Sequence, residues 1–288
     1  SNNQIIIAGI IPTYNNTTTS NLVLLNPNGS IDSTFNVSSS LIPGAIYSME
    51  LQSDNKIIVY NVVKISGTTS STATSYLKRF NANGSLDNTF SVNSTIFLSS
   101  TSSGFTLPSV RIIYDIKQLS NGKILISGDF NTVYGQTYGG IARLNSNGTV
   151  DTTFNVGTGI SSGTTQILNG TYNIYSIDVQ PDNKIIIGGS FPSFNNTSRN
   201  CIARLNVNGS LDTSFNPGTG IPFVNWDKVK NIKILADNKV LISGNFDSYN
   251  NVTMKSIARL NSDLVANDDN GTASFGTFST PIQNVRLN

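Results

Sequence analysis

The pattern of apolar and polar positions along the chain predicts short β-strands throughout. Brief runs rich in Ile, Val, Tyr and Phe are bounded by Gly, Asn, Asp or Pro, and no stretch shows the spacing of an amphipathic helix. Four such runs recur in the same order, and they are named here the first to fourth strands of a unit. We expect first strands at 45–52, 112–119, 173–180 and 229–236, and second strands at 56–62, 123–130, 184–191 and 239–246.

The second half of each unit carries a strongly repeated sequence. The segment CIARLNVNGSLDTSFNPGTGI at 201–221 reappears as GIARLNSNGTVDTTFNVGTGI at 140–160, and in more divergent form at 76–92 and 21–37. The copies are roughly 60 residues apart, a long period of the kind found in propellers and solenoids. Each contains an Asn-Gly pair, which favours a two-residue type I′ hairpin between the third and fourth strands. The pairs are Asn28-Gly29, Asn83-Gly84, Asn147-Gly148 and Asn208-Gly209.

The two ends of the sequence complement each other. Residues 1–36 supply a second, third and fourth strand, whereas PIQNVRLN at 281–288 has the pattern of a first strand. We therefore expect an all-β fold: a five-bladed β-propeller of four-stranded antiparallel blades, in which the C-terminal strand completes the first blade and removes an open edge. The alternative is an open fragment of a longer tandem array. The single expected domain, 1–288, has blades at 1–40 with 280–288, 41–95, 108–158, 170–218 and 228–279.

Composition narrows the chemistry that the chain can perform. Only 12% of the 288 residues are charged, the formal net charge is +2, histidine is absent and Cys201 is the single cysteine. Disulfides, histidine-based catalytic triads and the usual transition-metal clusters are therefore excluded, and nothing indicates nucleic-acid binding. No apolar run is long enough for membrane insertion. The surface rich in Asn, Ser and Thr favours an extracellular or cell-surface location, with a virion as the alternative, and we expect no cofactor.

The repeated aspartate of the NGSLD motif is expected to be structural. Copies in every blade of a ring lie too far apart to converge on one substrate. An arginine of the third strand is a candidate partner across the hairpin. The pairing is incomplete at both ends, because Leu24 stands in the arginine place of the first unit and Thr272 in the aspartate place of the last. The aspartates are Asp32, Asp87, Asp151 and Asp212, and the arginines are Arg79, Arg143, Arg204 and Arg259.

The first strands carry two polar columns. One consists of Ser48, Asp115, Ser176, Asn231 and Asn284, and the other, two residues further on, of Glu50, Lys117, Asp178, Lys233 and Arg286. Charges in the second column alternate in sign around a ring except between Lys233 and Arg286. If the first strand is innermost, this column forms a structural girdle of ion pairs near the central channel. A ligand site at the channel mouth, or solvated charges of little energetic value, are the alternatives.

The connections between strands differ from copy to copy, and recognition is expected there. The loops after the second strands, at 12–20, 131–140, 192–200 and 247–255, each combine an aromatic side chain with amides and hydroxyls, a mixture that suits sugars, polar protein surfaces or plain loop packing. The acidic loop with Asp263, Asp268 and Asp269 matches no calcium motif, so we expect a longer hairpin loop and no metal. The candidate binding residues are Tyr14, Tyr134, Tyr138, Phe194, Trp226 and Tyr249.

The sequence DNKIIIGGSF at 182–191, followed by NNTSRNCIARLNVNGSLDTSFNPGTG at 195–220, resembles the delta-60 repeat family of bacterial and phage propeller-like repeats. The resemblance covers essentially the whole chain and weakens at both ends, and Val59-Tyr60 stands where the family has small residues. It implies a β-propeller, an exposed location on a bacterial surface, in a secreted protein or in a phage, and no established catalytic residues.

These observations predict a non-enzymatic extracellular binding or scaffold module that presents loops to a protein or surface glycan as part of a larger surface protein. A phage tail or fibre component, structural or receptor-binding, is one alternative. A propeller glycoside hydrolase is the other, and it requires carboxylates that converge with a suitable separation. Only Glu50, Asp115 and Asp178 could supply them.

Overall fold

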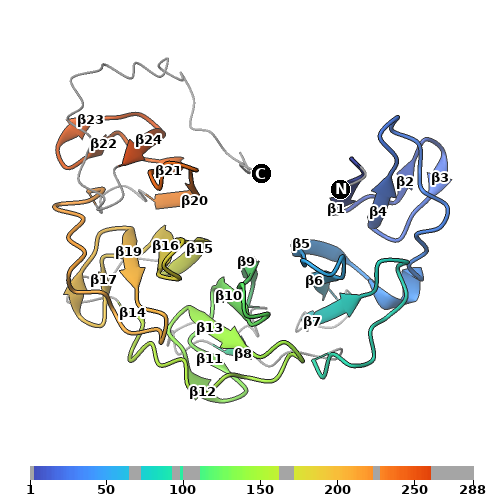
Figure 1. Cartoon of the computed structure of the whole chain (residues 1–288), viewed down its shortest axis with the longest axis horizontal. Coiled ribbons are helices and arrows are strands. Elements are labelled where there is room, and N and C mark those ends of the chain that lie inside the picture. The colour runs from blue at the N-terminus through green and yellow to red at the C-terminus, as the bar shows by residue number, and fades with distance from the viewer. Residues whose placement is uncertain are drawn as a thin grey trace.

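The expected short strands form five principal antiparallel sheets in a computed structural model that describes residues 3–64, 73–92, 98–99, 111–161, 172–222 and 228–260. Among these residues the fold is all-β apart from one short 3-10 helix, η1 (Ser39–Leu41). Figure 1 shows the sheets following one another along an arc, with the first and the last sheet on either side of its opening. The arrangement is that of β-propeller blades around a common axis.

Each sheet pairs its strands in chain order and antiparallel, as hairpin-connected strands do. The first sheet consists of β1 (Ile5–Ala8) and β4 (Leu22–Leu25). The others are β5 (Ala45–Leu51), β6 (Ile57–Lys64) and β7 (Ala73–Phe80); β9 (Ile113–Gln118), β10 (Ile124–Gly128) and β13 (Ile141–Leu144); β15 (Asn173–Val179), β16 (Ile185–Ser190) and β19 (Ile202–Leu205); and β20 (Lys228–Ile234), β21 (Val240–Asn245) and β24 (Ile257–Leu260).

The predicted first strands are innermost. β5, β9, β15 and β20, called the inner strands from here on, lie next to one another along the inner side of the arc (Figure 1). The strand bounds agree with the sequence prediction to within two residues. The first-strand segment predicted to complete the first blade, at 280–288, lies outside the described residues.

The core lies between successive sheets, which explains why the second strands are apolar on both faces. β10 is buried along its whole length, and so is β16. Ile186 of β16 belongs to one cluster with Val229 and Ile232 of the next inner strand. At about 25 cal/mol per Å² of buried apolar surface, this burial between units is the dominant stabilising contribution, and no unit obtains it alone.

The prediction of a full fourth strand was wrong. In its place a single β-bridge joins the end of the third strand to the residue after the turn, and the chain then bends away through the aspartate turn. The bridges are Leu25–Ile31, Phe80–Leu86, Leu144–Val150 and Leu205–Leu211.

The Asn-Gly pairs form a different turn from the one predicted. Only the glycine has positive φ, between 81° and 91°, while the asparagine does not. In the first copy the Gly29 amide donates to the Asn26 carbonyl, and the Asn26 amide to the Ser30 carbonyl, which describes a type I turn followed by a left-handed glycine. Type I′ hairpins occur instead in the loops after the second strands, where both central residues have positive φ. They are Asn15-Asn16, Tyr134-Gly135, Asn195-Asn196 and Asn250-Asn251.

Those type I′ turns join short strand pairs that the sequence analysis treated as loops. The pairs are β2 (Thr13–Tyr14) with β3 (Thr17–Thr18), β11 (Thr132–Val133) with β12 (Gln136–Thr137), β17 (Ser193–Phe194) with β18 (Thr197–Ser198), and β22 (Ser248–Tyr249) with β23 (Val252–Thr253). β8 (Leu98–Ser99) pairs with β11, and β14 (Ile160–Ser161) with β17.

Strand directions define two faces of the propeller. In the sheets where both are described, the turn between the first and second strands and the Asn-Gly turn lie at the same end, and this end is called the turn face. The short hairpins and the starts of the inner strands lie at the other end, called the hairpin face. Every functional feature described below belongs to one of these two faces.

Candidate binding face

The repeated aspartate of the turn face lies in a buried ion triad. In the third unit, Nε of Arg143 lies 2.6 Å from Oδ2 of Asp151, and Nζ of Lys123 lies 2.7 Å from the same oxygen. The carboxylate side chain is 4% exposed. The predicted arginine partner is therefore present, together with a lysine from the start of the second strand that sequence reasoning missed. The equivalent triads are Arg79–Asp87–Lys56 and Arg204–Asp212–Lys184.

The same arginine also ties its unit to the next one. Arg143 donates through Nη1 to the carbonyl of Val207 at 2.5 Å, and its guanidinium lies 4.7 Å from the centre of the Phe154 ring. Beside it, the Asn155 amide donates to the Asn208 carbonyl at 2.8 Å. The motif is therefore a joint between units. Equivalent bonds connect Arg79 to Ser146, Ser91 to Asn147, and Asn36 to Asn83.

Electrostatics agrees with this structural role. Burial by itself would raise the pKa of Asp151, but hydrogen bonds from Lys123, Thr153 and Arg143 hold that pKa well below its usual range. The pKa values of Asp87 and Asp212 are lowered by the same balance of burial against hydrogen bonds. A carboxylate that is ionised and fully hydrogen-bonded has no spare capacity for acid–base chemistry.

The joint is modified in the first unit, as its sequence requires. Leu24 replaces the arginine, and Gln4 donates to Asp32 instead. The side chain and amide of Thr34 lower the pKa of Asp32. In the last unit, Thr272 and the acidic loop at 263–269 lie outside the described residues.

The carboxylates of the inner strands connect neighbouring units. The Gln118 amide donates to Oε1 of Glu50 at 2.9 Å, and the Ile177 amide to Oδ2 of Asp115 at 2.8 Å. The Ile234 amide donates to Oδ2 of Asp178 at 2.7 Å in the same way. Each carboxylate thus accepts a backbone N–H from the following inner strand.

Of the predicted girdle of ion pairs, the pair between Lys117 and Asp178 is present: Nζ of Lys117 lies 3.6 Å from Oδ1 of Asp178. Lys233 lies on β20, in the unit after Asp178. Arg286 lies outside the described residues. The inner strands are therefore joined mainly by hydrogen bonds from carboxylate to amide.

Most of the aromatic side chains predicted to bind a ligand belong to the core. Phe194 and Tyr249 have no exposed surface, and Tyr138 is 4% exposed. The short hairpins fold back over their sheets and turn these rings inward. The prediction that these three residues contact a ligand is corrected accordingly, because nothing outside the protein reaches them.

The other three aromatic residues predicted to bind a ligand differ in how far they are exposed or described. Tyr134 occupies the tip of its hairpin and is 43% exposed. Tyr14 is partly exposed, and its hydroxyl donates to the Gly29 carbonyl at 2.9 Å, which anchors the ring to the same unit. Trp226 lies outside the described residues. Tyr134 is thus the predicted aromatic whose exposure suits a contact.

A second set of aromatic residues was missed by the sequence analysis. The register between first and second strands shifts by one residue at the same point in four sheets, and the unpaired residue of each β-bulge is Tyr47, Tyr114, Tyr175 or Lys230. The three tyrosines, called the tyrosine column, lie at the start of the inner strands, toward the hairpin face. β-Bulges re-aim side chains and occur often beside binding sites.

The β-bulge has a sequence marker, a glycine in the second strand opposite the bulge. A Cβ on Gly189 would lie 2.0 Å from the carbonyl oxygen of Asn173, because the bulge pushes the inner strand toward the second strand. Gly128 and Gly244 are held in the same way. In the second unit Asn61 replaces this glycine, and its Nδ2 donates to the Pro43 carbonyl at 2.6 Å.

The tyrosine column is continuous across units. The rings of Tyr114 and Tyr175 lie 4.9 Å apart between centroids at 58°, and Nζ of Lys228 lies 5.9 Å from the centre of the Tyr175 ring. Burial and the proximity of Tyr175 raise the pKa of Tyr114, with smaller contributions from Asp129 and Tyr47. The column therefore spans the second to fourth units, and Lys228 of the fifth unit lies at its end.

An ion pair borders the column. Nη1 of Arg111 lies 3.3 Å from Oδ2 of Asp129, and Tyr60 donates its hydroxyl to the Arg111 carbonyl. Burial raises the pKa of Asp129, although Arg111 opposes that effect. The column and its charged neighbours thus bring aromatic and ionisable side chains together at the hairpin ends of the inner strands.

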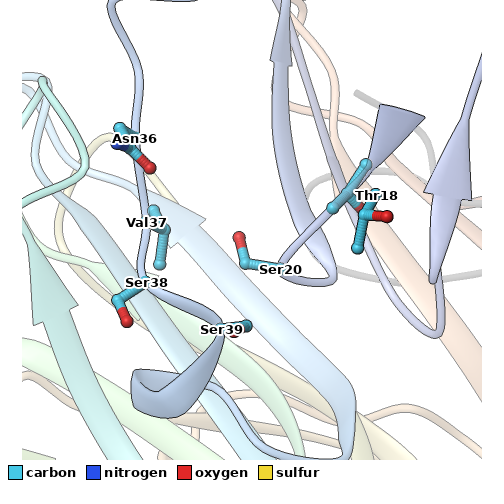
Figure 2. Close-up of a pocket in the computed structure, with 7 residues that line it drawn as sticks. Thr18, Ser20, Asn36, Val37, Ser38 and Ser39 are labelled. Atoms are coloured by element: carbon cyan, nitrogen blue, oxygen red, sulfur yellow. The ribbon is translucent and has the colours of Figure 1, made fainter.

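A separate hollow of about 490 Å³ lies in the first unit and is lined by hydroxyl-bearing residues. Figure 2 shows it between the chain that follows β3 and the segment leading into η1, with Ser20 facing Val37 and Ser38 across it. Several of its hydroxyls already have partners: Thr19 donates to Ile11, and Oγ of Ser38 and Ser40 lie 2.9 Å apart. The hollow carries no charge, and it is a weaker candidate than the tyrosine column.

Two further features bear on the kind of site. Within the described ranges, no cluster of three or more His, Cys, Asp or Glu side chains is arranged to hold a metal ion. Among the same residues, no helix is long and apolar enough to span a membrane.

The fold resembles several solved structures at low sequence identity. The extracellular domain of a hybrid two component system from B. thetaiotaomicron shares 14% identity with a TM-score of 0.44, over 93% of this chain and 28% of that chain. PorZ, a surface component of the type-IX secretion system of Porphyromonas gingivalis, shares 10% with a TM-score of 0.40, over 84% and 30%. A glucose dehydrogenase shares 8% with a TM-score of 0.35, over 83% and 89%. The chain thus spans less than a third of the first two proteins.

No curated protein matches the sequence. A family model described as "Domain of unknown function (DUF5122) beta-propeller" matches residues 1–35, 52–90, 119–154, 180–215 and 235–265. These segments carry the second and third strands of each unit and the Asn-Gly turn of the first four units. The expectation of propeller repeats is confirmed, while the narrower delta-60 name stays a prediction. Because the matched segments cover more than half of its length, the chain belongs to the DUF5122 β-propeller family.

Proposed function

We propose that this protein is a non-enzymatic binding module that presents the hairpin face of a β-propeller to a protein or a glycan. One observation carries the proposal: the two faces are built differently. On the turn face, the repeated arginines and aspartates are already paired with each other at the joints between units. The exposed tyrosines and the short hairpins, whose sequences differ between copies, lie on the hairpin face. Variation between copies on a constant scaffold is typical of recognition surfaces.

We further propose that the ring closes with five blades through residues 281–288. Among the described residues, β1 pairs on one side only, with β4, whereas the second strand of every other unit pairs on both sides. β1 also lies at the opening of the arc (Figure 1). An unpaired edge with Ile5 54% exposed is an aggregation hazard that a further strand would remove.

Amide hydrogen exchange tests closure. In the full chain, amides of Ile5–Ala8 are expected to exchange slowly on both edges of the strand, and removal of 280–288 is expected to accelerate them. Amides of β16, remote from the opening, serve as the internal control. Equal exchange at β1 with and without the segment would contradict closure.

The environment of the carboxylates supports a non-enzymatic role. A glycoside hydrolase needs one carboxyl group as acid and a second as base or nucleophile. Glu50, Asp115 and Asp178 each accept a backbone amide from the neighbouring unit, which is the use expected of structural acceptors. The triple variant Glu50→Gln, Asp115→Asn, Asp178→Asn, assayed with its parent on a polysaccharide panel, tests this directly. Hydrolysis by the parent that the variant loses would overturn the proposal.

An extracellular or cell-surface location, within a larger surface protein, is part of the proposal. It is supported by the composition: 12% charged residues, one cysteine, and a surface rich in hydroxyls and amides. The virion is the alternative location. Fractionation of the native host decides between them, since recovery in phage particles would replace the cell surface by the virion.

The binding role is tested with a glycan array and with extracts of host surfaces, using the full chain. Tyr134→Ala on the hairpin face is the test variant, and Lys56→Gln on the turn face is the matched control. We expect a ligand whose binding weakens with the first variant and not with the second. Binding that depends on the turn face, or no ligand in either screen, would count against the proposal.

A further inference from the structure

We propose that the tyrosine column, together with Lys228 and Lys230, binds a saccharide that carries a carboxylate. This inference rests on the proposed binding function and names the ligand class and the residues. It stands on the placement of three aromatic rings and two lysines at the starts of four successive inner strands.

The rings supply a stacking surface. Tyr47 is 39% exposed, and Tyr114 and Tyr175 are each partly exposed, in contrast to the fully buried hairpin aromatics. Because each sits at a β-bulge, its backbone is released from the ladder with the second strand, and the ring is placed beside the ring of the next unit. Rings at successive units present apolar faces that match the C–H faces of successive sugars.

The two lysines at the end of the tyrosine column favour an anionic ligand. Lys228 and Lys230 are neighbours on β20, and no carboxylate in the described part of the chain lies within ion-pair distance of either. Burial, with a contribution from Lys230, lowers the pKa of Lys228, so the two cations oppose each other. A carboxylate placed between them relieves this repulsion.

Other ligand chemistries fit less well. A quaternary ammonium ligand would meet the positive charges of Lys228 and Lys230 beside the rings, and the nearby carboxylate of Asp129 is already paired with Arg111. A neutral sugar would stack on the tyrosine rings but would not relieve the repulsion between the two lysines. A sugar acid uses both, with its ring against the tyrosines and its carboxylate against the lysines.

The experiment compares trigalacturonate with its carboxyl-reduced neutral form by calorimetric titration of the full chain. The parent is expected to bind the acidic form at least tenfold more tightly than the neutral form. The double variant Lys228→Gln, Lys230→Gln is expected to lose about tenfold in affinity for the acid and little for the neutral sugar. Tyr175→Leu is expected to weaken both forms. Lys255→Gln, an exposed charge change on the last hairpin, is the matched control and is expected to leave affinity unchanged.

Failure of this inference is distinguishable from failure of the binding function. Equal affinity for both sugars, or binding insensitive to the lysine and tyrosine variants, overturns the acidic-saccharide site and leaves a binding module with another site. No binding of either sugar, while the array or the extracts yield another ligand, also overturns it. No ligand in any of these experiments overturns the binding function as well. Thermal melting of each variant confirms that affinity is compared between folded proteins.

Discussion

The Arg143 guanidinium reaches from a buried ion pair with Asp151 to the carbonyl of Val207 in the next unit, so one side chain closes its own hairpin and holds its neighbour. Both ends of this contact lie in repeated sequence. The contact explains why the motif recurs in every well-formed copy: it is the place where units meet.

Removing the charge of Asp151 is expected to be costly. Asp151→Asn leaves the buried Arg143 without its counterion, and breaking a buried pair from one side destabilises a protein by about 3–5 kcal/mol. Asp32→Asn is the matched control, because Leu24 replaces the arginine in that unit, and we expect it to lose clearly less stability than Asp151→Asn. Urea unfolding measures both. Similar losses for the two variants would contradict the joint.

The Asn-Gly glycine is expected to matter for contact as well as for conformation. A Cβ on Gly148 would lie 2.6 Å from Cγ2 of Val92 and 2.9 Å from the Phe90 ring, whereas a Cβ on Gly29 meets only the Tyr14 hydroxyl at 4.0 Å. Both residues have positive φ, so both alanine variants should lose about 1–2 kcal/mol for the backbone. The difference in unfolding free energy between Gly148→Ala and Gly29→Ala isolates the contact with the preceding unit. We expect Gly148→Ala to be the more destabilised.

Stability is expected to fall in acid. The pKa values of Asp87, Asp151 and Asp212 are lower in the folded protein than the ordinary value of 3.8, so their contribution is complete above that value and is lost as the pH falls below it. Asp129 acts in the opposite direction, because its pKa is raised, but it is one group against three. Urea-unfolding midpoints measured between about pH 5 and pH 3 give the slope of stability against pH. In Asp151→Asn the slope should be shallower, and an unchanged slope would show that the triads do not control acid unfolding.

The inner-strand carboxylates are expected to be replaceable by amides. Asp178→Asn keeps an oxygen that accepts the Ile234 amide, whereas Asp178→Ala leaves that N–H without its acceptor. We expect a loss of about 1–3 kcal/mol for alanine and clearly less for asparagine. Equal losses would mean that the charge, and hence the pair with Lys117, is what stabilises the inner strands.

The strand positions were predictable from sequence because each apolar run is short, bounded by turn residues and repeated. The arginine–aspartate pair was predictable because the two residues face each other across a hairpin. The lysine of the triad was harder to find, since Lys123 belongs to the second strand and approaches Asp151 only when the sheet has formed.

The errors have physical causes. The Asn-Gly pair favours a type I′ turn in isolation, but here the type I turn with one left-handed glycine is compatible with close packing on the preceding unit. The hairpin aromatics were expected to be exposed because they stand among polar residues, but a two-residue turn folds Phe194 and Tyr249 back onto the core. The bulge could have been inferred from a glycine late in the second strand combined with tyrosine at one place in three first strands.

The joints also have a direction, since the second and third units each extend an arginine to the Asn-Gly turn of the following unit. At the three seams described between the first four units, a backbone amide also donates forward to that turn, a head-to-tail contact like that of an open-ended polymer. Recombination that duplicates or deletes one of these units would therefore preserve the backbone contact at the seam and change the curvature that the assembly must accommodate.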